Sequence, residues 1–416
     1  MRVAVSMNIR LYRFLDRFVG TTICGVLSGI NRVFGGTLKP AQPKKILIIL
    51  LSEMGSLMLA HPMFERLKLR YPGASLHILL FARNREVLDL LSLIPAENVV
   101  ALNDQSFSGL VLDTFRVLRT LRALGLDVVI DCELFARISS IFSYLSGAPV
   151  RVGFHRYTQE GLYRGSFLNR PVLYNPYRHI SQQFLALAEA IDSTSVPTGK
   201  HVSDPVKGIL PKVDISETEM QQTIGQLHSD FPTLKDKSLV LVYASGGILP
   251  IRAWPLEYYS SLCASLLQDG RAIGIIGLQE HAPIAQAIVA HCNSANCVDL
   301  TGYTSTVRHL LALYHRASLL IANDGAPGQF AALTPIPTLI FFGPETPVLY
   351  GPMSPNVHSL YVSMSCSPCL TAYNHRASPC DGDNQCLKQI KPEFVLAKAR
   401  ELLTVHALAA SDHDAR

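Results

Sequence analysis

The sequence lacks a strong charge of either sign and any apolar run long enough to cross a bilayer. Charged residues make up 17% of the 416 residues, hydrophobic residues make up 48%, and the formal net charge is only +5. This composition excludes a disordered chain and is typical of a well-packed globular protein. The chain is longer than a domain with a single hydrophobic core usually is, which suggests two domains. Residues 18–30 form an uncharged run of only 13 residues, which is too short to span a membrane.

Two common nucleotide-binding signatures are also missing. No glycine-rich loop ends in Gly-Lys-Ser/Thr, and no G-x-G-x-x-G spacing occurs anywhere in the chain. The first absence argues against a P-loop NTPase, and the second argues against a dinucleotide-binding domain of the usual kind. A phosphate site in this protein must therefore be built from other loops.

The small positive charge is unevenly placed. Residues 1–45 hold eight basic side chains and one acid, Asp16, so this stretch carries about +7 and the remainder about −2. The body of the protein is therefore not expected to bind nucleic acid. Apolar residues at positions 11, 14, 15 and 18 follow helical spacing beside arginines, so we expect residues 1–44 to form a basic amphipathic extension that contacts an anionic membrane. The alternatives are a helix packed on the protein's own surface and a signal peptide, although no small-x-small cleavage site stands out.

Short apolar runs alternate with helical periodicity along the rest of the chain. Strands are expected at 46–51, 75–81, 99–100, 127–130 and 151–154, and again at 239–243, 272–276, 297–300, 319–321 and 338–342. This alternation predicts α/β domains, each a parallel sheet covered by helices on both faces. A stretch rich in Ser, Pro and Lys, residues 193–214, marks the boundary between them. We therefore predict domains at 45–200 and 201–391, followed by a helix and tail at 392–416.

The stretch after the strand at 239–243 has the composition of a phosphate site. It reads Ala-Ser-Gly-Gly, continues to Arg252, and reaches a helix start at Trp254-Pro255. Small residues expose backbone N–H groups, and the arginine and the helix start both favour a bound anion. Ser245, Gly246, Gly247 and Arg252 are therefore predicted to bind a diphosphate. The alternative is a tight turn that carries a surface arginine.

Two further strand-end loops are rich in glycine and proline. Residues 322–329 read A-N-D-G-A-P-G-Q, and residues 342–347 read F-G-P-E-T-P. Asp324 could accept hydrogen bonds from ligand hydroxyls or order its own loop, and Gly325 and Gly328 would let the backbone approach a ligand closely. The alternative for the first loop is a simple Asn-Asp-Gly turn.

The nine cysteines comprise scattered single residues and one cluster near the C-terminus. Scattered cysteines in apolar segments suggest a reducing compartment. The cluster could hold a structural zinc ion through four thiolates, or its thiols could be free or paired in disulfides. The nearby His375 and Arg376 are expected at the surface rather than as metal ligands. The clustered cysteines are Cys366, Cys369, Cys380 and Cys386.

Four segments in order resemble glycosyltransferase family 9, the heptosyltransferase family of lipopolysaccharide core assembly. They are ILIILLSEMGSLMLAHPMFERLKLRYPGASLHIL, YASGGILPIRAWPLEYYSSLCASLL, DLTGYTSTVRHLLALYHRASLLIANDGAPGQFAAL and IFFGPETP. The resemblance covers about residues 45–390 and implies a GT-B fold, two doubly wound Rossmann-like domains facing one cleft. It further implies an inverting transferase that moves a sugar, plausibly a heptose, from a nucleotide-diphosphate donor to a lipid-linked saccharide. The N-terminal domain would take the acceptor and the C-terminal domain the donor.

The same resemblance implies a cytoplasmic enzyme, peripheral to the inner face of the cytoplasmic membrane, that needs no metal for catalysis. Arg252 would stabilise the departing nucleoside diphosphate, with Asp324 and Gly325 close to it. Gln279-Glu280 lies where a residue that contacts the nucleoside could sit.

This chain departs from the family pattern at two positions. Relatives usually carry Gly-Asp in the first loop, where this chain has Gly55-Ser56, and a His where it has Gln329. Because the missing Asp is the proposed general base, we hypothesise that Glu53 replaces it, beside Ser56 in the same turn. Asp131 and Glu133 are the alternative sources of a base. Two other functions stay open: a catalytically silent nucleotide-sugar-binding protein, and a GT-B-like nucleotide-sugar epimerase.

Overall fold

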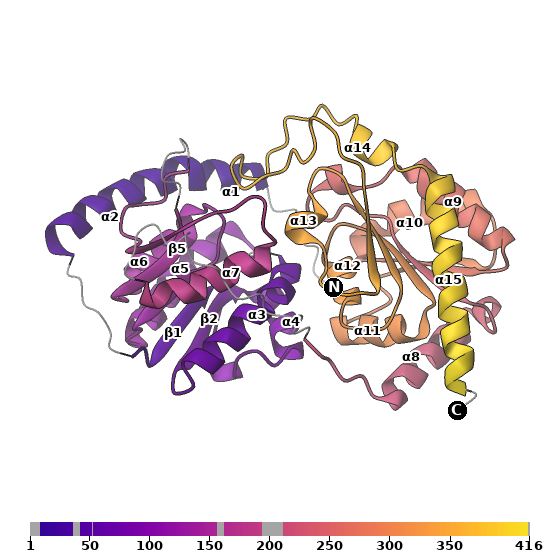
Figure 1. Ribbon diagram of the computed structural model, residues 1–416, viewed down its shortest axis with the longest axis horizontal. Coiled ribbons are helices and arrows are strands. Elements are labelled where there is room, and N and C mark those ends of the chain that lie inside the picture. The colour runs from indigo at the N-terminus through magenta and orange to yellow at the C-terminus, as the bar shows by residue number, and fades with distance from the viewer. Residues whose placement is uncertain (1–8, 36–41, 52, 156–161, 194–210, 415–416) are drawn as a thin grey trace. The chain divides into compact units, whose positions relative to one another are not determined.

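The computed structural model describes residues 9–35, 42–51, 53–155, 162–193 and 211–414. The chain separates into two compact units, Met1–Ile209 and Leu210–Arg416. Figure 1 shows one sheet surrounded by helices in each unit. The domain boundary expected after residue 200 lies outside the described residues.

The first unit is a doubly wound α/β domain. Its sheet has six parallel strands in the order β3-β2-β1-β4-β5-β6. The strands are β1 (Lys45–Ile49), β2 (Ser75–Phe81), β3 (Val99–Leu102), β4 (Val128–Asp131), β5 (Val150–His155) and β6 (Arg170–Leu173). The helices are α1 (Ile9–Leu15), α2 (Thr21–Phe34), α3 (Met54–Arg70), α4 (Arg85–Leu90), α5 (Phe107–Ala123), α6 (Arg137–Leu145) and α7 (Ile180–Glu189). The chain reverses its winding direction between β1 and β4, the place where such sheets bind ligands.

The second unit repeats this architecture. Its six parallel strands run in the order β12-β11-β10-β7-β8-β9, with the reversal between β7 and β10. The strands are β7 (Leu239–Tyr243), β8 (Ala272–Gly277), β9 (Cys297–Thr301), β10 (Leu319–Asn323), β11 (Thr338–Phe342) and β12 (Val357–Tyr361). The helices are α8 (Glu217–Asp230), α9 (Leu256–Gln268), α10 (Ala282–Cys292), α11 (Val307–Arg316), α12 (Ala326–Ala331), α13 (Pro347–Tyr350), α14 (Gln385–Lys388) and α15 (Pro392–Asp414).

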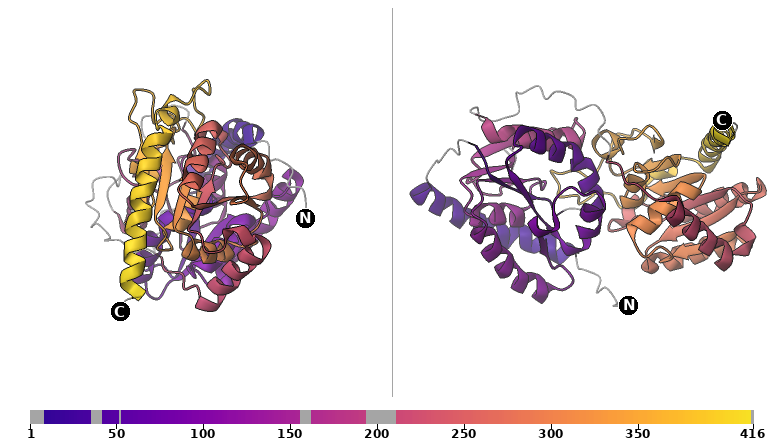
Figure 2. Two further views of the ribbon diagram at one scale, coloured as in Figure 1. Left: turned by 90° about the vertical axis from the view of Figure 1, so that its right-hand side faces the viewer. Right: turned by 90° about the horizontal axis from the view of Figure 1, so that it is seen from below.

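Apolar side chains on the strands explain both sheets. Strands β7, β10 and β11 each have five residues, and all of these residues are buried, as expected for central strands covered on both faces. In the second unit α9, α10 and α15 supply apolar side chains to one core with these strands. The yellow helix α15 runs beside the sheet of its unit in Figure 1 and in the left view of Figure 2. The α/β fold with two Rossmann-like units, expected from the sequence, is confirmed.

The N-terminal helices lie on the first unit as one long rod, through a short π-helical segment at Asp16–Gly20 (Figure 1). The carboxylate of Asp16 accepts hydrogen bonds from the backbone N–H groups of Arg137 (3.0 Å) and Ile138 (2.9 Å). These N–H groups begin α6 and have no partner within that helix, so Asp16 satisfies them. Ser28 lies 2.8 Å from the hydroxyl of Tyr163. One face of the rod is therefore fixed to the unit, as in the surface-packing alternative.

The opposite face of this rod is apolar and exposed. Arg17 and Arg32 are exposed beside it, and the guanidinium of Arg17 lies 5.9 Å from the ring centroid of Phe18. Within the described residues, no helix is both long and apolar enough to span a membrane. The exposed apolar side chains are Leu11, Phe14, Phe18, Val19, Ile23, Val26, Ile30, Val33 and Phe34.

Candidate active site

The predicted site residues follow the strands at the reversal point of each sheet. Glu53 and Ser56 come after β1, the loop at 244–252 comes after β7, and Asp324 comes directly after β10. Carboxyl ends of parallel strands meet at one edge of a sheet, so the donor residues predicted from two separate stretches lie at one edge of the second unit.

The loop after β7 is tightly folded. A Cβ atom on Gly246 would lie 2.7 Å from the carbonyl oxygen of Leu249, so this position requires glycine. Gly247 has φ +61°, and its backbone N–H donates to the Ser245 hydroxyl at 3.0 Å. This N–H therefore has a hydrogen-bond partner within the loop itself. Arg252 ends a short 3-10 turn that begins at Pro250, and α9 begins at Leu256, one residue after the helix start expected at Pro255.

Asn323, at the end of β10, connects the donor loops. Its side-chain oxygen accepts hydrogen bonds from the backbone N–H of Trp254 and the hydroxyl of Tyr259, both at 2.9 Å. Its amide nitrogen donates to the carbonyl oxygen of Ser245 at 3.1 Å. Asn323 is fully buried, so these bonds form in a low-dielectric environment where an unsatisfied partner is costly. One side chain thus holds the Ser245 loop against the residues that follow Arg252.

Arg252 forms part of a buried charge cluster. Its Nη1 atom lies 3.7 Å from a carboxylate oxygen of Asp324 and 3.7 Å from one of Glu345. All three side chains are less than a tenth exposed. The structure therefore brings Arg252 and Asp324 together as a set, and a surface arginine on a tight turn is the wrong description. Glu345, in the loop after β11, was not among the predicted site residues.

The loop after β10 is only partly as expected. A Cβ atom on Gly325 would meet no atom closer than 3.9 Å, which leaves room beside it. A Cβ on Gly328 would lie 2.5 Å from the side chain of Ile340, so this glycine permits close packing of α12 on β11. The Gln329 amide donates to the carbonyl oxygen of Tyr350 at 2.6 Å. Gln329 therefore ties α12 to α13. Glu280, in the predicted nucleoside-contacting pair, is largely exposed.

In the first unit, Glu53 and Ser56 belong to the start of α3. Glu53 occupies the N-cap position with an extended backbone, and the backbone N–H of Ser56 donates to the Glu53 carbonyl at 2.9 Å. Both side chains are partly exposed. They follow β1 at the reversal point of the sheet, so a group bound at this edge can reach them.

The two alternative carboxylates are committed to the fold. Asp131 is fully buried and forms an ion pair with the buried Arg164. Burial raises the pKa of Asp131 to about 6, and the charge of Arg164 opposes this shift. Glu133 accepts a hydrogen bond from the backbone N–H of Leu51 at 2.7 Å, and Arg164 donates to the Glu133 carbonyl at 2.7 Å. Glu133 therefore supports the loop that carries Glu53, and Asp131 holds Arg164 in place.

The cysteine cluster does not form a metal site in this structure. Within the described ranges, no three or more His, Cys, Asp or Glu side chains gather closely enough to hold an ion. The Cys369 sulfur lies 3.1 Å from the Ser378 hydroxyl, and the Cys380 sulfur points to Asp381 at 3.8 Å. Burial, and then the proximity of Cys369 and Cys380, raises the pKa of Cys386 to about 11. The thiols are close neighbours without the tetrahedral arrangement of a zinc site.

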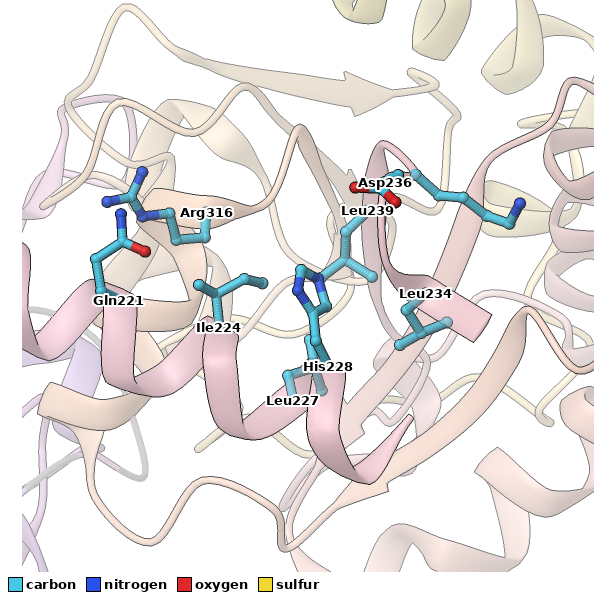
Figure 3. A pocket seen from close by; sticks show the side chains of 9 residues that line it. Gln221, Ile224, Leu227, His228, Leu234, Asp236, Leu239 and Arg316 are labelled. Atoms are coloured by element: carbon cyan, nitrogen blue, oxygen red, sulfur yellow. The ribbon is translucent and has the colours of Figure 1, made fainter. Parts of the chain in front are cut away.

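A separate cavity of about 300 Å³ lies in the second unit. Figure 3 shows side chains from one face of α8 directed toward Leu234 and Leu239. Leu239 is the first residue of β7, so the cavity is at the opposite end of that strand from the Ser245 loop. It contains none of the predicted site residues.

Sequence reasoning missed three residues of the site: Asn323, Glu345 and Arg376. Asn323 was read only as part of a turn, although a polar residue ending a buried strand is a signal for a structural hydrogen bond. Arg376, expected at the surface, is partly exposed and has a buried partner. Its Nε atom lies 3.1 Å from Glu345, and its side chain is only 28% exposed.

Comparisons with known proteins agree with the fold. The model of "Glycosyltransferase family 9 (heptosyltransferase)" matches residues 114–377, more than half of the chain. Lipopolysaccharide heptosyltransferase 2 of Salmonella typhimurium is 24% identical over 366 residues, covering 86% of this chain and 99% of the relative. The solved ADP-heptose lps heptosyltransferase II of E. coli has a TM-score of 0.67 at 20% identity, covering 87% of this chain and 99% of that one.

A more distant structure is the iron-containing dodecameric glycosyltransferase TibC from enterotoxigenic E. coli. Its TM-score is 0.50 at 13% identity, covering 88% of this chain and 78% of that one. The family match spans the loop at Ser245–Arg252 and the loops that carry Asp324 and Glu345. The resemblance identified from the sequence motifs is therefore confirmed, and the chain belongs to glycosyltransferase family 9, the heptosyltransferase family.

Proposed function

We propose that this glycosyltransferase moves a heptose from an ADP-linked donor to a lipid-linked saccharide of the lipopolysaccharide core. The observation that carries the proposal is the buried Arg252–Asp324–Glu345 cluster at the reversal point of the second sheet. The names of the relatives supply the sugar, nucleotide and acceptor. The second unit binds the donor, and the first unit binds the acceptor.

Arg252 acts on the leaving group. As the bond between the anomeric carbon and the diphosphate breaks, negative charge grows on the departing oxygen, and a guanidinium held nearby stabilises that charge. The ion-pair distances of 3.7 Å to Asp324 and Glu345 are longer than charge-assisted hydrogen bonds of about 2.8 Å. A diphosphate can form hydrogen bonds of that shorter length with the Arg252 guanidinium. The loop that carries Ser245, Gly246 and Gly247 lies beside the diphosphate. Asp324 and Gly325 face the sugar.

Glu53 acts on the acceptor. Its carboxylate removes the proton of the attacking hydroxyl while that oxygen bonds to the anomeric carbon, which inverts the configuration. Asp131 pairs with Arg164 and Glu133 accepts the Leu51 N–H, whereas Glu53 is partly exposed in the loop after β1, where an acceptor hydroxyl can reach its carboxylate. Ser56, in the same turn, donates a hydrogen bond to the acceptor. No metal takes part in this step.

Replacing Arg252 tests the donor assignment. We expect Arg252→Gln to lower kcat/KM for ADP-heptose by about 10²–10³-fold, the usual cost of losing one transition-state stabilising group. The assay measures transfer to extracted lipopolysaccharide core. Arg400→Gln is the matched control, because Arg400 pairs with Asp269 on the surface at 2.8 Å and should keep normal kcat/KM. A near-normal rate for Arg252→Gln would refute the assignment, and donor binding by the wild type without transfer would favour the silent-protein alternative.

The exposed apolar face of the N-terminal rod contacts a membrane that bears anionic lipid. Leu11 through Phe34 present large apolar side chains to solvent, a surface of the kind that marks an interaction site. The flanking cations Arg17 and Arg32 complement anionic headgroups. We propose that the enzyme acts in the cytoplasm, peripheral to the inner face of the cytoplasmic membrane, where a lipid-linked acceptor is available.

Vesicle binding tests this contact. We expect Phe18→Ser/Phe34→Ser to lower binding to vesicles containing phosphatidylglycerol by at least about 10-fold, since each buried Phe contributes about 1.5–3 kcal/mol. Co-sedimentation measures the bound fraction. The matched control is Leu112→Ser/Phe115→Ser on α5, whose side chains are 72% and 69% exposed. Equal losses in both double variants, or no loss in the first, would contradict the assignment.

The cysteine cluster has a structural role and binds zinc or iron only after rearrangement. Cys366, Cys369, Cys380 and Cys386 supply the soft ligands that either metal accepts. Elemental measurement on the purified protein decides between a bound metal and free thiols. Catalysis itself needs no cofactor.

A further inference from the structure

The cysteine-rich segment, residues 364–386, is attached to two of the loops that form the candidate donor site. The backbone N–H groups of Cys369 and Leu370 both donate to the Pro344 carbonyl at 2.9 Å. The Asn384 amide donates to the Ile251 carbonyl at 2.6 Å, one residue before Arg252. The segment therefore forms part of the wall of the donor site, and not a separate structural appendage.

This segment brings a second guanidinium to the site. Arg376 lies with its Nε atom 3.1 Å from one carboxylate oxygen of Glu345, while the other oxygen of Glu345 lies 3.7 Å from Arg252. One buried carboxylate thus stands between two arginines. The guanidinium of Arg376 also lies 5.1 Å from the ring centroid of Tyr350, a cation–π contact that holds the side chain beside this ring.

The turn that carries Arg376 is strongly constrained. The Arg376 backbone N–H donates to the Thr371 carbonyl at 2.9 Å, and the Asn374 amide donates to the Cys369 carbonyl at 2.7 Å. His375 and Arg376 both have left-handed backbone conformations, with φ +53° and +56°. Non-glycine residues adopt this conformation only where surrounding contacts enforce it. The position of Arg376 is therefore set by the whole turn.

The formal charges of the four side chains in this cluster sum to zero. Arg252 and Arg376 carry two positive charges, and Asp324 and Glu345 carry two negative charges, so the carboxylates offset the repulsion between the two guanidiniums. Arg376 keeps 28% of its side chain exposed, so a ligand can approach its guanidinium. Arginine binds phosphate through two parallel N–H groups, so two arginines on one carboxylate suit a two-phosphate anion.

We propose that Arg376 binds the diphosphate of the donor together with Arg252, so that the cysteine-rich segment supplies half of the phosphate-binding charge. This inference rests on the proposed donor function. Glu345 holds the two guanidiniums on one side while the diphosphate approaches from the other. The functional reason for the cysteine-rich segment is then the placement of Arg376.

The test compares ADP with adenosine, which lacks the phosphates. We expect Arg376→Gln to raise the Kd for ADP by about 10-fold, the cost of losing one charged hydrogen-bonding group, and to leave the Kd for adenosine unchanged. Arg376→Lys should recover part of the ADP affinity, because it restores the charge without the planar fork. Isothermal titration calorimetry measures both ligands, with Arg400→Gln as the matched control.

The outcomes separate the two proposals. If the wild type does not bind ADP, the proposed donor function fails. If the wild type binds ADP, Arg252→Gln weakens it, and Arg376→Gln behaves like Arg400→Gln, then only the role of Arg376 is overturned. An equal weakening of ADP and adenosine by Arg376→Gln would also overturn it, because a general disturbance of the fold does not distinguish the two ligands.

Discussion

Glu53→Gln is expected to lower kcat for sugar transfer by about 10²–10⁴-fold, the range over which a positioned general base contributes. The amide has nearly the shape of the carboxylate but cannot take the proton of the acceptor hydroxyl. The Kd for ADP should stay normal, because Glu53 belongs to the first unit and the donor residues belong to the second. A loss of kcat with intact donor binding separates catalysis from folding.

Glu65→Gln is the matched control for this prediction. Glu65 lies on the same helix, α3, and pairs with Lys68 at 3.0 Å near the surface, where such pairs contribute less than about 1 kcal/mol. Its turnover should therefore be normal. Near-normal turnover in Glu53→Gln would remove Glu53 as the base.

Glu133→Gln distinguishes the remaining candidate. Because Glu133 accepts the Leu51 N–H, its replacement weakens a contact that holds the catalytic loop, and we expect a smaller fall in kcat with a lower unfolding midpoint. If Glu133→Gln instead abolished transfer while stability stayed unchanged, the base would be Glu133. The two variants thus give different pairs of results for the two assignments.

The sheets were largely predictable, because their central strands are continuous apolar runs. Two edge strands were not predicted, because neither is a continuous apolar run. Strand β6 contains Pro171, and β12 is only partly buried. Helix α8 was also missed, although its capping box was present in the sequence. Ser216 and Glu219 form the reciprocal bonds of that motif, which is a recognisable helix start.

The candidate donor site was predictable in its loops but not in its charge balance. The sequence places Arg252 after a small-residue loop, and the structure adds Glu345 and Arg376 from far along the chain. No local pattern reports such partners, because they meet only through strand pairing and the folding of the cysteine-rich segment. Gly328 has a role that the composition of its loop does not indicate. This glycine lies in a loop expected to approach a ligand, and it packs closely on Ile340.

Asn323→Leu is expected to destabilise the second unit by about 3–5 kcal/mol. Leucine is close in size, so the main effect is to leave the Trp254 N–H, the Tyr259 hydroxyl and the Ser245 carbonyl without their partner. Each unsatisfied buried group costs about 1–3 kcal/mol. The Ser245 loop would also lose its tie to the residues after Arg252, so the Kd for ADP should rise together with the loss of stability.

The single tryptophan of the chain gives a direct readout. Trp254 is buried and stacks on Phe341 at 4.6 Å, so its fluorescence during urea unfolding reports the second unit alone. Asn103→Leu is the control. Asn103 is exposed in the first unit, and its side-chain oxygen accepts a hydrogen bond from the Gln105 N–H. Its Trp254 transition should be unchanged. If Asn323→Leu shifted this transition by less than about 1 kcal/mol, the buried amide would not be the connection that holds the donor loops, and their order would have to come from the packing of Trp254 itself.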